Sequence, residues 1–287
     1  MKKIIIVMII LILSIIFYVI FRHKEYGYTP IMYEICDDDS CIYLLGSMHL
    51  GDDRINKLSN IVRKAYSKSD KIAVELNVNS VNINISDYID TNNEISEELN
   101  NKLIDFSNNH ILFPYDVLKN MKLGYIYDYI SLLPYLENGY NTEGLDNYFI
   151  NLAEEDNKEI IELETYDEQL SLLFGYSNEF YSKQLEEVIN NYDDIKDLSI
   201  KLYEAYLNSD INELKKLIDE DSISNTEEEE RYLKAMYDDR NSKMSKKIEE
   251  FLDKDEKVFM IVGCAHVIGN NGIVELLNNK YKISIVK

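Results

Sequence analysis

The sequence predicts an α/β domain with a mainly parallel central sheet flanked by helices. Short runs of aliphatic and β-branched residues alternate with longer segments of helical periodicity, an order typical of strand–helix–strand units. Helical patterns also fill most of the chain between Leu163 and Val258, which is too long for one crossover. We therefore expect a large helical insertion at about residues 166–255. With 46% hydrophobic residues the chain can bury a sizeable core.

Each expected element rests on a local pattern. Short β-type runs between turn residues predict strands, and apolar residues at i, i+3 and i+4 predict helices. The strands expected in chain order are Ile31–Cys36, Cys41–Leu45, Lys71–Leu76, Lys158–Leu163 as a core strand, Val258–Val262 and Lys282–Val286. The expected helices are Arg54–Lys68 (capped by Asp52 or Asp53), Glu94–Asn108, Tyr115–Leu133 (bounded by Pro114 and Pro134), Leu145–Asp156, most of Asp167–Ile218, Glu227–Leu252 and Gly272–Asn278.

The first 25 residues form a separate segment. A basic start is followed by the apolar run Ile4–Phe21, which is just long enough to cross a bilayer because about 20 apolar residues are needed. A cleaved signal peptide is the rival interpretation, but Phe21 and Arg22 stand where small residues would form the cleavage site. We expect residues 1–25 to be one N-terminal transmembrane helix that anchors a domain of residues 26–287.

The strongly acidic composition limits the partners. The formal net charge is −22. This argues against nucleic-acid binding, which requires clustered Lys and Arg to neutralise phosphates. The acidity serves solubility or attracts cationic partners through the field of the surface.

Three cysteines do not make a disulfide scaffold. Cys36 and Cys41 bracket a predicted hairpin turn, so they form a disulfide if the domain lies outside the cell or stay reduced otherwise; both interpretations remain open. Cys264 is interpreted as a small buried filler, with a soft metal ligand as the alternative.

The pattern Gly-x-x-His occurs twice, as Gly46–His49 and Gly263–His266, each time directly after a predicted strand. Glu75 and Glu164 follow two other strands. Because the carboxyl ends of parallel strands meet at one edge of a sheet, we expect these imidazoles and carboxylates to converge. The other two histidines, His23 and His110, are expected on the surface.

Several segments in this order resemble the TraB/GumN family, which includes the Tiki-like membrane peptidases and the PrgY-type pheromone-shutdown proteins. The resemblance implies a metal-dependent hydrolase fold with paired Gly-x-x-His units, a glutamate at the site, association with the membrane, and action on peptides or proteins. The segments that carry it are Ile42–His49, Ala73–Leu76, Glu143–Asp146, Ile160–Thr165, Glu168–Leu170, Arg240–Met244, Val262–Gly269 and Gly272–Ile273.

The proposed site chemistry centres on a divalent metal ion. His49 and His266 are expected to ligate one Zn, Mn, Fe or Co ion, and Glu75 either completes the metal site or acts as general base. In the alternative interpretation the two histidines only cap their strands through backbone hydrogen bonds. Gly46 and Gly263 are secondary candidates, since they end the strands that present the histidines.

Two further residues, Arg240 and Glu164, have two interpretations each. Arg240, next to Asn241, either stabilises an oxyanion or substrate carboxylate, or forms a surface salt bridge. Asn241 is a secondary candidate by its position beside Arg240. Glu164 either orients a histidine or caps the helix that begins near Tyr166, and the cap is favoured.

These expectations combine into a membrane-anchored, metal-dependent peptidase that cleaves peptides or exposed protein tails. The alternatives are a protein that sequesters a peptide signal without cleaving it, and a protein that binds iron or haem through the paired histidines. The family resemblance favours a single-pass protein of the cell membrane with its soluble domain outside. The sequence does not give the substrate, the metal or the oligomeric state.

Overall fold

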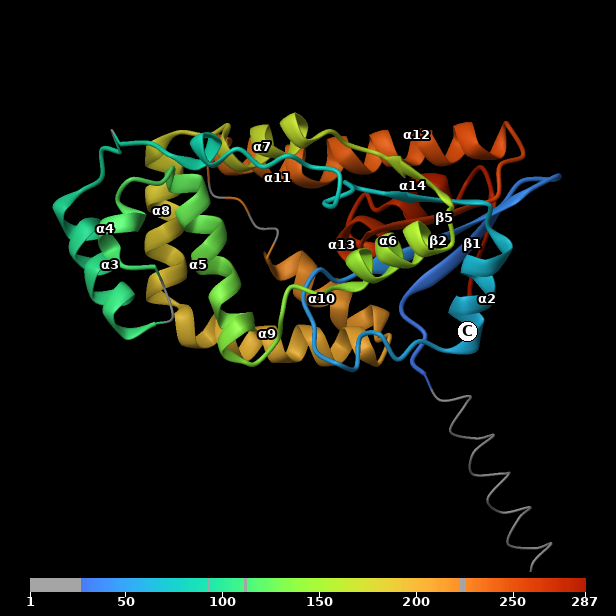
Figure 1. Ribbon diagram of the computed structural model, residues 1–287, viewed down its shortest axis with the longest axis horizontal. Coiled ribbons are helices and arrows are strands. Elements are labelled where there is room, and N and C mark those ends of the chain that lie inside the picture. The colour runs from blue at the N-terminus through green and yellow to red at the C-terminus, as the bar shows by residue number, and fades with distance from the viewer. Residues whose placement is uncertain (1–26, 92, 111–112, 222–223, 225) are drawn as a thin grey trace, which may run out of the picture.

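The computed structural model describes residues 27–91, 93–110, 113–221, 224 and 226–287 (Figure 1). In these ranges no helix is both long enough and apolar enough to cross a bilayer. The transmembrane helix predicted at residues 1–25 lies outside the described residues, so it stays a prediction.

One mixed sheet of six strands forms the centre of the described chain, in the order β4-β3-β5-β2-β1-β6. The neighbours β4-β3, β3-β5 and β5-β2 are parallel, whereas β1 pairs antiparallel with both β2 and β6. The predicted α/β class with a mainly parallel sheet is confirmed. The strands are β1 (Met32–Cys36), β2 (Cys41–Ser47), β3 (Lys71–Val74), β4 (Glu159–Glu162), β5 (Val258–Gly263) and β6 (Lys282–Ile285).

Two details of the sheet bear on the predictions. The hairpin of β1 and β2 is confirmed, and a disulfide joins Cys36 to Cys41, which face each other across it. The interpretation of β4 as a core strand is wrong. It lies at one edge of the sheet, where the side chains of Glu159 and Glu162 are exposed.

Five helices pack around the sheet, and Tyr203, Tyr206 and Leu214 from two further helices join the same hydrophobic core. Three aromatic rings from α2, α6 and β5 meet there: the ring centroids of Tyr66 and Phe259 lie 5.9 Å apart, and those of Phe149 and Phe259 lie 4.9 Å apart. Burying each such side chain contributes on the order of 2 kcal/mol to folding. The helices are α2 (Asn60–Lys68), α6 (Leu145–Glu155), α12 (Arg240–Leu252), α13 (Cys264–Ile268) and α14 (Ile273–Leu277).

Most of the remaining helices form the opposite end of the elongated molecule, whereas α9 and α10 extend back toward the sheet (Figure 1). At that opposite end, Ile126 and Ile130 of α5 pack with Leu185 of α8 in a second hydrophobic cluster. This helical part uses residues 97–137 in addition to helices within the expected insertion. The helices are α3 (Glu97–Asn109), α4 (Tyr115–Leu118), α5 (Leu123–Glu137), α7 (Tyr166–Phe174), α8 (Asn178–Asn190), α9 (Tyr192–Leu207), α10 (Ile211–Asp221) and α11 (Glu227–Leu233), with the short 3₁₀ turn η1 (Ile85–Tyr88) on a connecting loop.

Two predicted helices are wrong in extent because tertiary backbone pairing overrides the local pattern. The helix expected from Arg54 begins only at Asn60, since Tyr28 exchanges backbone hydrogen bonds with Lys57 and Ser59. Asp52 therefore caps no helix; its carboxylate accepts from the backbone N–H of Arg54 within a turn.

The helix expected at Tyr115–Leu133 is divided into α4 and α5. Met121 forms an isolated bridge with Ile89, and Lys122 donates its backbone N–H to Tyr88, which keeps the chain between the two helices extended. Pro134 does not end the helix, because α5 continues through it to Glu137.

The helix expected at Glu227–Leu252 contains a π-helical segment, η2 (Lys234–Asp239), between α11 and α12. A π turn holds one more residue than an α turn, and such turns are frequent at functional sites. The first residue of α12 is Arg240, a candidate site residue.

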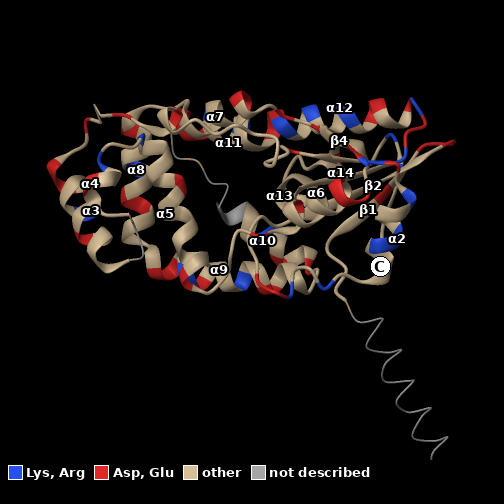
Figure 2. Ribbon diagram, in the orientation of Figure 1, with Lys and Arg blue, Asp and Glu red and all other residues tan. Residues whose placement is uncertain are grey.

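The acidic residues are spread over helices at both ends of the molecule (Figure 2). In α12 the lysines precede the glutamates along the helix, and Lys247 forms an ion pair with Glu250. The net charge of −22 is therefore a property of the whole surface.

Candidate functional site

The site lies where the carboxyl ends of the parallel strands meet. β2 leads to His49, β3 to Glu75, β4 to Glu164 and β5 to His266. These predicted residues come together around Gly263: a Cβ built there would lie 3.4 Å from Oε1 of Glu75, 3.5 Å from Cδ2 of His266 and 3.7 Å from Nε2 of His49. Both Gly-x-x-His units thus present their imidazoles to one small space, as the sequence predicts.

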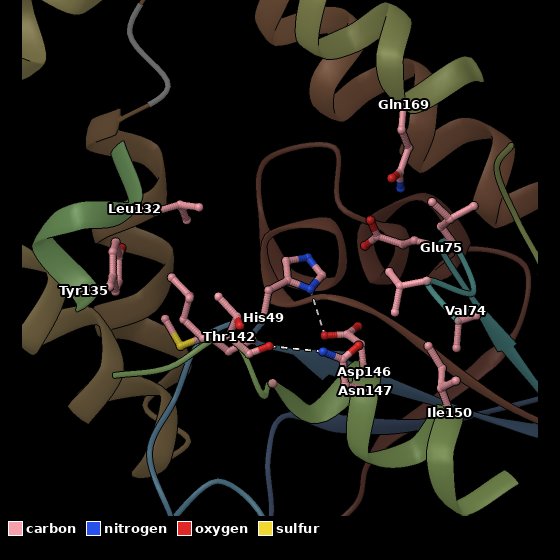
Figure 3. Close-up of a pocket in the computed structure, with 15 residues that line it drawn as sticks. His49, Val74, Glu75, Leu132, Tyr135, Thr142, Asp146, Asn147, Ile150 and Gln169 are labelled. Atoms are coloured by element: carbon pink, nitrogen blue, oxygen red, sulfur yellow. Dashed lines mark hydrogen bonds and ion pairs between the residues drawn. The ribbon is translucent and has the colours of Figure 1, made fainter. Parts of the chain in front are cut away.

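His49 is held by a carboxylate that the sequence analysis did not single out. Nδ1 of His49 lies 2.8 Å from Oδ2 of Asp146 (Figure 3). Ser47 donates its hydroxyl to the other oxygen of Asp146 at 2.6 Å. The negative charge of Asp146 raises the pKa of His49 above its ordinary value, against the effect of desolvation. Because the His49 side chain is 63% exposed, water moderates this effect.

The position of Asp146 depends on a close contact between two backbones. Asp146 lies in the first turn of α6, and Gly144 precedes that helix. A Cβ on Gly144 would lie 2.4 Å from the carbonyl oxygen of Met48 and 2.6 Å from Cα of His49, so only glycine lets the start of α6 reach the histidine. The segment Glu143–Asp146 thereby places its carboxylate under the ring.

His266 is buried and has a neutral partner. Its Nδ1 lies 2.7 Å from Oδ1 of Asn241 in α12, and Asn241 is fully buried. The ring of Tyr237 packs at 5.8 Å between centroids. Burial lowers the pKa of His266 to about 4, so its ring is neutral at pH 7. The two histidines of the site therefore have different electrostatic environments.

Glu75 is a buried carboxylate with both oxygens bonded. Oε1 accepts the backbone N–H of Gly263 at 2.6 Å, and Oε2 accepts from Nη2 of Arg240 at 2.5 Å. Nε2 of His266 lies 3.8 Å from Oε1. Burial alone would raise the pKa of Glu75. The attraction of its carboxylate to His266, when that ring is protonated in acid, and to Arg240 and His49 outweighs burial and lowers the pKa to about 2.

Arg240 and Glu164 support Glu75 at Oε2, the oxygen that does not contact Gly263. The guanidinium donates to both oxygens of Glu164, whose side chain is only 3% exposed. The interpretation of Arg240 as a surface salt bridge is wrong, since its side chain is 12% exposed.

The favoured interpretation of Glu164 as a helix cap is also wrong. Thr165 caps α7, in a capping box with Glu168. Glu164 instead orients Arg240, and it accepts a further hydrogen bond from Gln169 at 3.3 Å. The alternative, that Glu164 orients a histidine, does not match these contacts either.

Two other candidates lie beside the site without contributing to it. A Cβ on Gly46 would lie 3.1 Å from Cα of Cys264, so Gly46 lets α13 approach β2 closely. The thiol of Cys264 is free and packs in that contact, where burial raises its pKa to about 12.

His110, expected on the surface, is partly buried. Its Nδ1 lies 2.8 Å from Oε1 of Glu137, and its ring stacks on Phe106 in the helical part of the molecule. His23 lies outside the described residues.

A pocket of about 560 Å³ opens beside His49 and Glu75. Figure 3 shows Leu132 and Tyr135 of α5 on one side of it and Glu75 and Gln169 on the other. Its polar groups come from the ends of β2 and β3 and from α6 and α7, while most of the remaining wall is apolar. The apolar lining comprises Met48, Leu50, Val74, Leu76, Val78, Leu132 and Ile150.

Of the described side chains at the site, the two imidazoles can ligate a metal ion, but a complete set of ligands is not formed. Each imidazole uses Nδ1 for an oxygen of a neighbouring side chain, which leaves Nε2, and metal-ligating histidines are commonly oriented in this way. In the described part of the chain, however, no group of three or more His, Cys, Asp and Glu side chains is arranged to hold a metal ion. The two imidazoles fit as ligands, whereas Glu75 is bonded to Gly263 and Arg240.

Asp146 and Ser47 are the functional candidates that sequence reasoning missed. Asp146 lies 97 residues from His49 along the chain, so no local pattern connects them. The available signal was the segment Glu143–Asp146 within the family resemblance, where an acid follows a glycine at the start of a helix. The sequence analysis included that segment in the resemblance but assigned no role to Asp146.

The comparisons with known proteins address the family but not the reaction. No curated protein and no solved structure matches the chain. The model of the TraB/PrgY/gumN family matches residues 31–284, which is nearly all of the described chain and includes every residue of the site. The chain therefore belongs to the TraB/PrgY/gumN family.

Proposed function

We propose that this protein is a membrane-anchored, metal-dependent hydrolase that cleaves peptides or protein tails at the space between His49, Glu75 and His266. The observation that carries the proposal is the convergence of both imidazoles and one carboxylate within 3.7 Å of a single point beside Gly263. Membership of the TraB/PrgY/gumN family supports it.

His49 and His266 would hold the metal through Nε2, with Asp146 and Asn241 orienting the rings. A divalent cation bound there supplies Lewis-acid polarisation of the scissile carbonyl. The protein's own groups exclude bulk water from the base of the site, since His266 and Glu75 are both buried.

Glu75 is better suited to provide a negative charge at the site than to act as a general base. A general base works best with a pKa near the operating pH, whereas the pKa of Glu75 is lowered to about 2. Its ionised carboxylate favours a cation at the site, and Arg240 keeps it fixed between Glu164 and Gly263. Of the two predicted roles for Glu75, these contacts favour a metal partner over a base.

The pocket supports a peptide substrate with an apolar side chain next to the scissile bond. Val78 and Leu132 line the wall beside the polar cluster, and the volume of about 560 Å³ accommodates a side chain with adjoining backbone. The apolar wall favours such side chains over charged ones because a charged group would be desolvated there without a partner.

A second candidate is a protein that binds a peptide without cleaving it. One observation favours it: within the described ranges no three ligand-type side chains are arranged for a metal, and Arg240 already neutralises Glu75. The same pocket would then retain its ligand through apolar contacts.

The disulfide between Cys36 and Cys41 supports the predicted location outside the cell. Disulfides persist in oxidising compartments and are rare in the cytosol. We propose that the membrane segment leaves the domain on the outer side of the cell membrane.

The proposal is tested with the full chain purified in detergent. Metal content is measured by elemental analysis for the wild type, His49→Ala, His266→Ala and the matched control His110→Ala, and peptide mixtures incubated with each protein are analysed by mass spectrometry. We expect about one metal per chain and cleaved peptides for the wild type and the control, and loss of both in the two site variants. Metal content unchanged in both site variants contradicts the metal proposal; bound but intact peptides establish the second candidate.

A further inference from the structure

The side-chain amide of Asn241 has a defined orientation. Asn241 is fully buried in α12, with one end of its amide 3.0 Å from the backbone carbonyl oxygen of Asn271 and the other end 2.7 Å from Nδ1 of His266. A carbonyl oxygen only accepts hydrogen bonds, so the NH₂ group must face Asn271. The reversed amide would bring two oxygens together in a dry environment and leave both without a donor.

The carbonyl group of Asn271 is itself fixed by its surroundings. Asn271 has a φ of 52°, in the left-handed region that asparagine tolerates better than most residues. Its side chain donates to Asp238 at 3.2 Å, and Gly272 donates its backbone N–H to Gly269 in the same turn. The turn therefore determines how the amide of Asn241 is oriented.

We propose that Asn241 is a positioning residue that fixes His266 in a single tautomer, with the proton on Nδ1 and the lone pair on Nε2. Oδ1 of Asn241 accepts, so Nδ1 of His266 must donate. Burial favours the neutral ring, for which the two tautomers are distinct species.

This tautomer determines what the site binds. The lone pair of Nε2 is then directed to the side of Glu75, whose Oε1 is 3.8 Å away, and neither atom carries a proton. Nε2 of His49 adjoins the same space. Facing acceptors are stabilised by an electropositive species between them, a cation above all. With the proton on Nε2, the N–H group of His266 would itself face the Glu75 carboxylate, and the space between the two side chains would disfavour a cation. This step alone rests on the proposed function; the tautomer does not.

The first test is the metal-free wild-type protein. NMR spectra of the full chain in detergent, labelled with ¹⁵N at histidine, distinguish protonated from bare ring nitrogens near neutral pH. The chain has 4 histidines, so His266→Gln assigns the ring of interest by the loss of its signals. We expect a protonated Nδ1 and a bare Nε2. A proton on Nε2 would overturn the inference and would leave peptide cleavage unaddressed.

Substitutions test whether Asn241 is the cause. Asn241→Leu removes the acceptor at similar volume and should shift His266 to a tautomer mixture. Asn138→Leu is the matched control, because Asn138 also donates to a backbone carbonyl, that of Lys196, but in the helical part of the molecule. A folded Asn241→Leu protein with an unchanged His266 spectrum would contradict the positioning role. If the tautomer is as proposed but no peptide is cleaved, the proposed function fails and this inference stands.

Discussion

Arg240 donates two parallel hydrogen bonds to Glu164, from Nε to Oε1 at 2.6 Å and from Nη2 to Oε2 at 2.9 Å. The same Nη2 reaches Glu75 at 2.5 Å. One planar guanidinium therefore donates hydrogen bonds to two buried carboxylates at once, which a lysine ammonium cannot do with the same geometry.

We expect Arg240→Lys to lower the free energy of unfolding by about 2 kcal/mol, because charge-assisted hydrogen bonds to buried carboxylates are lost while the charge remains. Lys243→Met is the control. It removes an exposed ion pair with Glu168 and should cost less than about 1 kcal/mol. Urea unfolding of both variants measures the difference. Equal losses of unfolding free energy would mean that the buried hydrogen bonds of Arg240 contribute no more than a surface ion pair.

Gly263→Ala should weaken metal binding at the site without destabilising the fold. The added Cβ would have ordinary contacts of 3.4–3.7 Å, and the φ of Gly263, −48°, suits any residue. We expect the free energy of unfolding to change by less than about 1 kcal/mol, while metal retention falls because the methyl group occupies the space between the rings. Gly144→Ala, whose Cβ would lie 2.4 Å from a carbonyl oxygen, should destabilise the protein instead. Unaltered metal content in Gly263→Ala would place the metal elsewhere.

Val78→Ser should weaken the preference for apolar peptides. Val78 lines the pocket and is 52% exposed, so folding does not depend on it. We expect kcat/KM for peptides with a large apolar residue at the scissile bond to fall roughly tenfold, or binding to weaken equally if no cleavage occurs. Ile85→Ser, on the same loop and 72% exposed but outside the pocket lining, should behave as wild type. Identical behaviour of the two variants would exclude this wall as the specificity pocket.

Asp52 should make stability depend on pH in acid. Hydrogen bonds from Arg54, and one from the hydroxyl of Tyr203, lower the pKa of Asp52 from 3.8 to about 2. Because the folded pKa is the lower one, the stabilisation is complete above about pH 4 and disappears as the pH falls toward 2. We expect Asp52→Asn to be about 1 kcal/mol less stable than wild type at pH 7. Urea midpoints across this range should converge in acid; a constant difference would show that ionisation is not the cause.

The disulfide between Cys36 and Cys41 should stabilise the hairpin end of the sheet. Closing a loop between cysteines 5 residues apart in sequence contributes about 2 kcal/mol in the chain-entropy model. We expect the free energy of unfolding of Cys36→Ser to be lower by that amount and to be unaffected by a reducing agent, whereas the wild type should lose stability on reduction. Thiol labelling of protein from intact cells should leave both cysteines unmodified.

Local patterns in the sequence were sufficient to predict the strands and the rim of the sheet. The apolar runs at β3 and β5 coincide with buried strands, and parallel pairing then brings Glu75 and His266 to one edge. This follows because the carboxyl end of a buried strand is visible in the sequence as the point where the apolar run stops.

What the sequence did not predict depends on partners that are distant along the chain. The start of α2 is set by pairing with Tyr28, and the role of Glu164 is set by Arg240, 76 residues away. The position of β4 at the edge of the sheet likewise depends on which strands pair, which its own residues do not encode.

The π-helical segment Lys234–Asp239 holds one residue more than the same number of α-helical turns would. Deleting one amino acid from this segment would return it to an ordinary α-helix while α11 and α12 keep their faces, so Arg240 and Asn241 would stay beside Glu75 and His266. The regular turns of α12 have no such reserve. Because each α-helical residue turns the helix by roughly 100°, a deletion there would rotate one part of α12 away from its present neighbours. The same loss of one in-frame triplet is therefore absorbed in one half of this long helix and disruptive in the other.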